Sequence, residues 1–103
     1  MALDLKISSS DDKSLVELIG DLDIYTSPEF NKDILKEFNK NKKDIVFDAS
    51  GLDYIDSTGL GAFISLYKTV NENGKTIKII GIKQNVKKIF TITELDKIFR
   101  IED

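Results

Sequence analysis

The chain contains neither cysteine nor histidine among its 103 residues. Without cysteine it can form no disulfide and carry out no thiol chemistry, which fits a cytoplasmic protein. Without histidine it can build no Ser-His-Asp triad, and no zinc site with nitrogen or sulfur ligands is possible within the chain. Carboxylates, hydroxyls and lysines are the side chains left to carry any chemistry.

Long apolar runs and an excess of positive charge are missing as well. No segment approaches the roughly 20 apolar residues of a membrane span, and the N-terminus lacks the basic start and apolar run of a signal peptide. The net charge is -3, so there is no surplus of cations to neutralise nucleic-acid phosphates. We therefore expect a cytoplasmic protein that neither inserts into membranes nor contacts nucleic acid directly.

The length fits one domain, residues 1–103, which begins with a predicted hairpin. Leu3, Leu5 and Ile7 alternate with polar residues, a pattern typical of a half-buried strand. The segment "SLVELIG" predicts a second strand that ends at Gly20. Three further apolar segments predict strands, and they read "IVF", "TIKIIGI" and, at the last sheet edge, "IFRI". The segment "DASGLDYID", directly after "IVF", is expected to be a loop.

The segment "DLDIYTSPEF" predicts the start of the first helix, and two capping patterns overlap in it. Thr26 with Glu29 fits a capping box. Ser27 followed by Pro28 fits an N-cap with proline at the first helical position. The two patterns differ by one residue, and both predict a helix that begins here.

Two further helices are predicted downstream. Apolar residues from Leu60 to Val70 recur at helical spacing, and Gly74 is a typical C-terminal stop. Asn85 is the expected cap of the next helix, and a short helical turn is expected at residues 94–97. A hairpin followed by alternating helices and strands predicts an α/β fold with right-handed crossovers.

The central motif "DSTGLG", residues 56–61, matches none of the familiar catalytic loops. It lacks the lysine of a P-loop and the full glycine pattern of a dinucleotide-binding turn. Ser57 is preceded by Ile55 and Asp56 rather than by the glycine of a nucleophile elbow, and no histidine is available. A serine hydrolase is therefore excluded, and the glycine pair alone is weak support for nucleotide binding.

Five aspartates follow or end the predicted strands, and they could form a metal or acid–base cluster at one sheet edge. The simpler interpretation, which we favour, is that they are solvated loop acids. A negative charge at Asp56 is in addition favoured by the nearby helix N-terminus. The five residues are Asp21, Asp23, Asp48, Asp53 and Asp56.

Ser57 is predicted to lie at or beside a helix N-cap, with its hydroxyl exposed and free backbone N–H groups nearby. Gly59 and Gly61 carry no side chain, so the active site of another protein could approach the same turn closely. This arrangement suits a residue that is modified. A plain serine cap, with glycines selected for packing against a strand, is the alternative, and the residues alone leave both open.

Three segments together resemble the anti-sigma factor antagonists, which are single STAS domains. The segment "GDLDIYTSPEF" resembles the family's sequence before the first helix. The segment "IVFDASGLDYIDSTGLGAF" resembles its central strand and phosphorylation motif, and "VKKIFTITELDKIFRI" resembles its C-terminal helix and last strand. The resemblance implies an N-terminal hairpin, then alternating helices and strands, in a mixed four- to five-stranded sheet flanked by helices.

The resemblance also implies a partner-switching role without catalysis or cofactor. Such proteins, when unphosphorylated, bind an anti-sigma factor that is also a serine kinase, and a sigma factor is released. The kinase phosphorylates the serine that follows the motif aspartate, which is Ser57 here, and a metal-dependent phosphatase reverses this. Thr58 stands where many members have a second serine, a mild departure from the pattern. The implied partner-binding residues are Asp21, Asp23, Thr26, Asp56, Thr58, Gly59, Leu60 and Gly61.

Two other functions remain as alternatives. The first is a STAS subunit that docks on a membrane ABC transporter, a role for which an intact phosphorylation motif is not needed. The second is weak nucleotide hydrolysis by the aspartate cluster, against which the missing phosphate loop counts.

Overall fold

The computed structural model describes residues 2–102, so Met1 and Asp103, the ends of the predicted domain, lie outside the described residues. An N-terminal hairpin is followed by alternating helices and strands, and the predicted α/β order is confirmed. The elements are β1 (Leu3–Ser9), β2 (Lys13–Leu22), α1 (Ser27–Asn41), β3 (Asp44–Ile55), α2 (Ser57–Glu72), β4 (Ile77–Ile80), α3 (Gln84–Ile92), η1 (Leu95–Lys97) and β5 (Arg100–Glu102).

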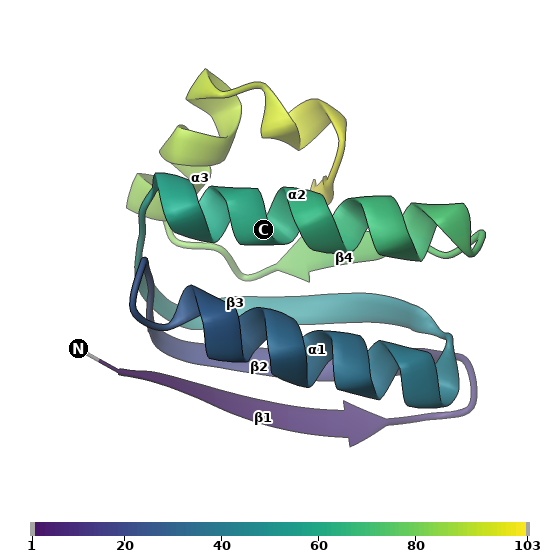
Figure 1. Cartoon of the computed structure of the whole chain (residues 1–103). Helices are drawn as coiled ribbons and strands as arrows, with labels where there is room; N and C mark the ends of the chain where they lie inside the picture. The colour runs from purple at the N-terminus through teal and green to yellow at the C-terminus, as the bar shows by residue number, and fades with distance from the viewer. Residues whose placement is uncertain (1, 103) are drawn as a thin grey trace.

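The five strands form one mixed sheet in the order β1-β2-β3-β4-β5. β1 is antiparallel to β2, and each later strand is parallel to its neighbour. From β2 to β5 the order of the strands in the sheet is their order in the chain. Right-handed crossovers between such strands place their helices on the same face of the sheet. Figure 1 shows α1 and α2 lying side by side in front of the sheet. The carboxyl ends of β2 and β3 therefore lead into neighbouring helices at one edge.

The core lies between the sheet and these helices, and phenylalanines dominate it. Phe63 of α2 is central, because its ring centroid lies 5.1 Å from Phe47 of β3 and 5.4 Å from Phe30 of α1. The rings of Phe90 and Phe99 lie 5.7 and 5.8 Å from Phe63 on its other side. All five side chains are buried, and contacts of this geometry add to the stabilisation from burial alone. The packing of α2 on the sheet is thus fixed from several directions.

The prediction that "DASGLDYID" is a loop is wrong, because its residues up to Ile55 continue strand β3. Two register shifts against β2 explain why the pattern was missed. Glu17 pairs with Asp48 but Ile19 with Gly51, so β3 gains one residue, and it gains another before Tyr54. Each extra residue changes the spacing of the buried side chains from two to three. The buried side chains of β3 are Ile45, Phe47, Ala49, Leu52 and Ile55.

The helix boundaries correct two capping predictions. Thr26 is the N-cap of α1, but its side chain makes no capping hydrogen bond, so neither the capping box nor an N-cap at Ser27 is present. Lys83 rather than Asn85 is the N-cap of α3. The Asn85 amide instead donates to the Asp53 carbonyl at 3.2 Å, which ties α3 to the end of β3. Gly74, with φ at +72°, follows α2 as predicted.

None of the helices within residues 2–102 is both long and apolar enough to cross a membrane.

Candidate functional site at the entrances of α1 and α2

The loops that lead into α1 and α2 meet at the carboxyl edge of the sheet. The Asp56 N–H donates to the Leu22 carbonyl at 3.3 Å, which joins the end of β3 to the end of β2. The Ile24 N–H donates to Asp56 Oδ2 at 3.1 Å, across 32 residues of sequence. These two bonds hold the two loops together as one surface.

Asp56 is the N-cap of α2, and both of its carboxylate oxygens accept backbone hydrogen bonds. Oδ1 accepts from the Gly59 N–H at 2.9 Å inside the helix, while Oδ2 accepts from Ile24 in the neighbouring loop. A carboxylate at this position also opposes the positive end of the helix dipole. Asp56 therefore fixes the start of α2 and the loop before α1 at once.

Ser57 is the first helical residue of α2, directly beside the cap, and both it and Thr58 are exposed. Within the described residues the Ser57 hydroxyl has no hydrogen-bond partner. Because Asp56 takes the Gly59 N–H, the N–H groups of Ser57 and Thr58 are the ones left for an added anion. The Thr58 hydroxyl likewise has no partner among the described residues, so two adjacent free hydroxyls lie at this helix N-terminus, with Ser57 directly beside the cap.

The loop before α1 is held by a compact set of local hydrogen bonds. Asp23 Oδ1 accepts from the N–H groups of Tyr25 and Thr26 at 2.9 and 3.1 Å. The Thr26 hydroxyl accepts from the Asp23 N–H and donates to the Asp21 carbonyl, each at 2.9 Å. Asp23 and Thr26 therefore shape this loop from within, and both remain half-buried.

Three exposed side chains with large apolar surface, on the loop before α1 and near the end of β3, were missed by the sequence analysis. Ile24, Tyr25 and Tyr54 are 59%, 86% and 51% exposed, although all three are large and apolar. Ile24 and Tyr25 lie on the loop that Asp56 holds, and Tyr54 stands two residues before Asp56. The bond from the Ile24 N–H to Asp56 holds the loop with Ile24 and Tyr25 against the start of α2, so their exposed apolar surface is available to a partner there. The sequence signal was the pair "IY" in a loop where no strand or helix needs it.

The two motif glycines have different surroundings. A Cβ on Gly59 would lie 2.6 Å from the Leu22 carbonyl oxygen, so α2 reaches the sheet closely enough only with glycine there. A Cβ on Gly61 would meet nothing within 4 Å. Leu60, between them, is 8% exposed and belongs to the core. The fold thus supplies a packing reason for Gly59 and Leu60, but none for Gly61.

The predicted site residues divide accordingly into three groups by exposure. Asp21, Gly59 and Leu60 are buried, Asp23, Thr26 and Asp56 are half-buried, and Ser57, Thr58 and Gly61 are exposed.

The five aspartates do not share one site. Asp23 and Asp56 lie in adjoining loops, but Asp48 accepts from the Ser50 N–H at 3.0 Å and Asp53 forms an ion pair with Lys83. Across residues 2–102 no three carboxylates come together in a way that could hold a metal ion.

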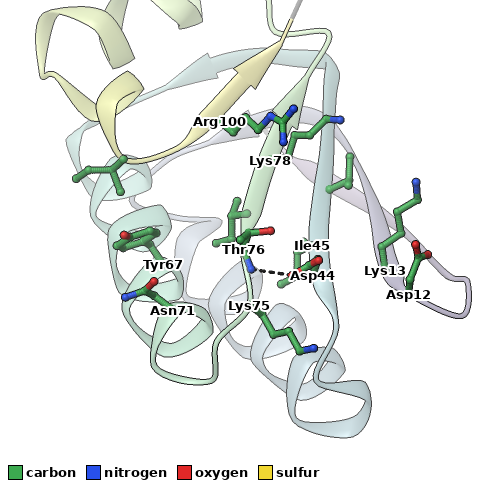
Figure 2. Close-up of a pocket in the computed structure, with 13 residues that line it drawn as sticks. Asp12, Lys13, Asp44, Ile45, Tyr67, Asn71, Lys75, Thr76, Lys78 and Arg100 are labelled. Atoms are coloured by element: carbon green, nitrogen blue, oxygen red, sulfur yellow. Dashed lines mark hydrogen bonds between the residues drawn. The ribbon is translucent and has the colours of Figure 1, made fainter.

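A pocket of about 380 Å³ lies at the opposite end of the parallel strands from the helix entrances, where β3 and β4 begin (Figure 2). The Thr76 N–H donates to Asp44 Oδ1 at 2.9 Å in its centre, and Tyr67 of α2 closes one side. None of the predicted site residues lines this pocket, so it is separate from the two helix entrances.

Comparison with known proteins places this geometry in a family. The STAS domain family model matches residues 4–103. The chain belongs to the STAS domain family. This assignment agrees with the mixed sheet and the helix order, and the matched range includes the "DSTGLG" turn.

Similar proteins extend the assignment of this STAS domain. An anti-sigma-B factor antagonist from Staphylococcus epidermidis is 30% identical over 103 residues, which cover 100% of this chain and 95% of that relative. The crystal structure of a candidate anti-sigma factor antagonist from Thermotoga maritima has a TM-score of 0.89 at 26% identity, covering 96% of this chain and 86% of that one. The unphosphorylated anti-sigma factor antagonist SpoIIAA shares the fold, with a TM-score of 0.75 at 16% identity, and 99% of this chain covers 88% of it.

Proposed function

We propose that this STAS domain is an anti-sigma factor antagonist switched by phosphorylation of Ser57. Its unphosphorylated form binds an anti-sigma factor in the cytoplasm and thereby releases a sigma factor. The observation that carries the proposal is the exposed Ser57 hydroxyl at the first position of α2, with no partner among the described residues. The likeness to the staphylococcal antagonist over the whole chain supports the same role.

Three exposed side chains with large apolar surface are suited to a protein partner. Ile24 and Tyr25 present aliphatic and aromatic surface on the loop that Asp56 holds against the start of α2, Tyr54 is exposed near the end of β3, and a Cβ on Gly61 would meet nothing within 4 Å. Tyrosine is among the residues that dominate binding energy at protein interfaces. In this proposal the anti-sigma factor packs on these residues, and its kinase site reaches Ser57 along the bare face at Gly61.

Phosphorylation is proposed to block binding without refolding the domain. A phosphoserine carries about -1.5 to -2 charges at pH 7. The N–H groups of Ser57 and Thr58 favour an anion, but the half-buried carboxylates of Asp23 and Asp56 lie in the same two loops. A partner that covers this surface would have to desolvate the dianion, which costs several kcal/mol when the charge is poorly paired. A cost of roughly 4 kcal/mol would convert micromolar binding into millimolar binding.

The chain itself is proposed to act as a binding module and not as an enzyme. The anti-sigma factor supplies the kinase activity that transfers the γ-phosphoryl group of ATP to the Ser57 oxygen, and a metal-dependent phosphatase removes it. The bonds that Asp23 and Asp56 accept from backbone N–H groups give these carboxylates a structural task.

The test is capture of partners from native cells, followed by phosphorylation with the captured kinase. Immobilised chain should retain a histidine-kinase-like ATPase, and incubation with ATP should add one phosphate by intact mass. Ser57→Ala should abolish this addition, whereas Ser65→Ala, an exposed serine two turns further along α2, should leave it unchanged. Ser57→Asp should weaken partner binding at least about a hundredfold.

Three results would contradict the proposal. Phosphate found mainly on Thr58 would show that the site is assigned to the wrong hydroxyl. Retention of a transporter ATPase in place of the kinase would favour the docking role on a membrane transporter. A Ser57→Asp chain that binds as tightly as the unmodified one would remove the switch.

A further inference from the structure

The edge of the sheet formed by β1 is open. β1 is the first strand in the sheet order and pairs only with β2 among residues 2–102, so one row of its N–H and C=O groups faces outward. It is 7 residues long, whereas β5 at the other edge has 3. A long unpaired edge strand is a template for pairing with another chain. In Figure 1, β1 is the purple strand with α1 beside it and α2 beyond.

A groove runs between β1 and α1 along this edge. Two adjoining hollows, of about 280 and 220 Å³, share Asp33 as a wall. Leu3 and Leu5 line the first hollow and Ile7 the second, and Ile7 is 38% exposed. These three side chains point to the same side of β1 because they alternate along it. The groove therefore has an apolar floor that α1 covers only in part.

Five charged residues of α1 line this groove. Glu37 accepts a hydrogen bond from the Asn41 amide at 2.5 Å, and the other four form a stripe, Glu29, Asp33, Lys36 and Lys40. Their spacing of four, three and four residues keeps them on one face of the helix. Within the part of the chain that the structure describes, none of the four takes part in an ion pair. The acidic half lies near the start of α1 and the basic half near its end.

The helix alone does not account for this order. Its dipole favours Glu29 in the first turn and Lys40 in the last, but the effect fades within one turn and does not reach Asp33 or Lys36. Glu29 and Asp33 are like charges four residues apart, as are Lys36 and Lys40, and such pairs destabilise an isolated helix. The two blocks of like charge become favourable when a surface with the opposite order of charges lies against them.

The stripe is complementary to itself when reversed. Its midpoint lies between Ile34 and Leu35, and Glu29 is as far from this point as Lys40, with opposite charge. Asp33 and Lys36 are related in the same way. We propose that the face formed by β1 and α1 binds a second copy of this chain in an antiparallel, two-fold arrangement. Each copy then contributes the same patch, as in the commonest kind of homodimer.

The sequence of β1 suits this arrangement as well. Identical strands related by a two-fold axis pair antiparallel, which would join two sheets into one. If Leu5 pairs with Leu5 of the other copy, Asp4 of each copy lies opposite Lys6 of the other. Opposite charges that face each other across a strand pair are stabilising. The apolar residues of both strands would then form one continuous floor beneath the two helices.

The groove reaches Thr26 at the entrance of α1, but no residue of the entrance of α2 lines it. In Figure 1, α1 lies between β1 and α2, so the dimer would leave Ser57 uncovered. Two switch surfaces would be carried on one dimer. The proposal does not depend on phosphorylation or on any anti-sigma partner, and it is tested on the purified chain alone.

The experiment is sedimentation velocity from about 5 to about 500 μM, with charge-reversal variants of the stripe. The unmodified chain should show a concentration-dependent dimer. Glu29→Lys with Asp33→Lys makes the whole stripe positive, and Lys36→Glu with Lys40→Glu makes it wholly negative. Each variant alone should self-associate at least about tenfold more weakly, because every opposed pair becomes repulsive. The two variants mixed should form a heterodimer, because every opposed pair is then attractive.

Matched controls carry the same charge changes on other helices. Lys68→Glu with Lys88→Glu, both exposed and on α2 and α3, should leave the dimer unchanged.

Ile7→Lys, at the apolar floor, should weaken the dimer independently of the stripe. A monomer at every concentration would overturn the proposal, as would reversal variants that fail to associate when mixed. A control that weakens the dimer as much as the stripe variants would also overturn it.

Discussion

The entrances of α1 and α2 are built from the same kinds of residue but expose them differently. Each has a serine at its first helical position, behind a polar N-cap. Ser27 of α1 is 3% exposed, and its hydroxyl donates to the Asp23 carbonyl at 2.6 Å. Ser57 of α2 is exposed and has no partner among residues 2–102. Local sequence therefore places a hydroxyl at a helix start, and the surrounding fold decides whether another protein can reach it.

The two entrances also differ in what holds them. The loop before α1 is stabilised by bonds within residues 21–27, so it is largely self-contained. The entrance of α2 relies on contacts distant in sequence, with Leu22 and Ile24 against Gly59 and Asp56. Substitutions should therefore disturb α1 locally, whereas at α2 they should loosen the contact between two loops.

Gly59→Ala should have the largest effect on stability. The new Cβ would lie 2.6 Å from a backbone oxygen of Leu22, and rotation of a side chain cannot relieve that contact. Overpacking costs roughly 1–3 kcal/mol, and a contact with fixed backbone lies at the upper end of this range, so about 2 kcal/mol remains after the gain of about 1 kcal/mol in helix propensity. Urea denaturation should show a net loss of about 2 kcal/mol. Unchanged stability would mean that α2 can move away from β2 without cost.

Asp56→Ala should come next, with a loss of about 1.5 kcal/mol, because the cap of α2 and the bond to Ile24 disappear together. Asp56→Asn keeps one acceptor oxygen and should lose about half as much. Amide exchange reports on each bond separately, and the amides of Ile24 and Gly59 should both exchange faster in Asp56→Ala. Asp23→Ala is the control, because Asp23 bonds only within its own loop and should leave Gly59 protected.

The regular parts of the fold could be predicted from the sequence because their residues report local periodicity. The hairpin, the three helices and the last strand are read from apolar spacing alone. The second half of β3 could not be, since its two added residues are fixed by pairing with β2 and replace the alternation with a spacing of three. Asn85 was misassigned for a similar reason, because its amide is used by Asp53 of a distant strand.

The candidate site divides along the same line. The position of Ser57 at a helix start follows from its own neighbours in the sequence. The bond from Ile24 to Asp56 and the exposure of Tyr25 depend on how two crossovers meet at the sheet edge. Gly59 and Gly61 look equivalent in the motif, and the positions of Leu22 and Ile55 against Gly59 distinguish them.

Ser27→Ala and Ser57→Ala should differ in a predictable direction. Ser27→Ala removes a buried hydrogen bond and should cost about 1 kcal/mol, although the Asp23 carbonyl keeps its bond from the Ser27 N–H at 2.9 Å. Ser57→Ala removes an exposed hydroxyl and should change stability by less than about 0.5 kcal/mol. Thermal unfolding of both variants in one buffer measures the difference. Equal costs would indicate that the Ser57 hydroxyl is used within the fold.

Gly61→Ala should change stability in the opposite direction to the other substitutions. The position is exposed within α2, and an added Cβ meets nothing within 4 Å, so the variant should gain up to about 1 kcal/mol from helix propensity. The fold therefore gives no reason for glycine here, and close approach of a partner is the reason that we propose. The stabilised variant should bind the captured anti-sigma factor at least about tenfold more weakly, as measured by calorimetry. Ser65→Ala, one turn further along the same helix, should leave the affinity unchanged. Tight binding by Gly61→Ala would place the partner elsewhere on the surface and leave Ser57 without the close contact that the switch requires.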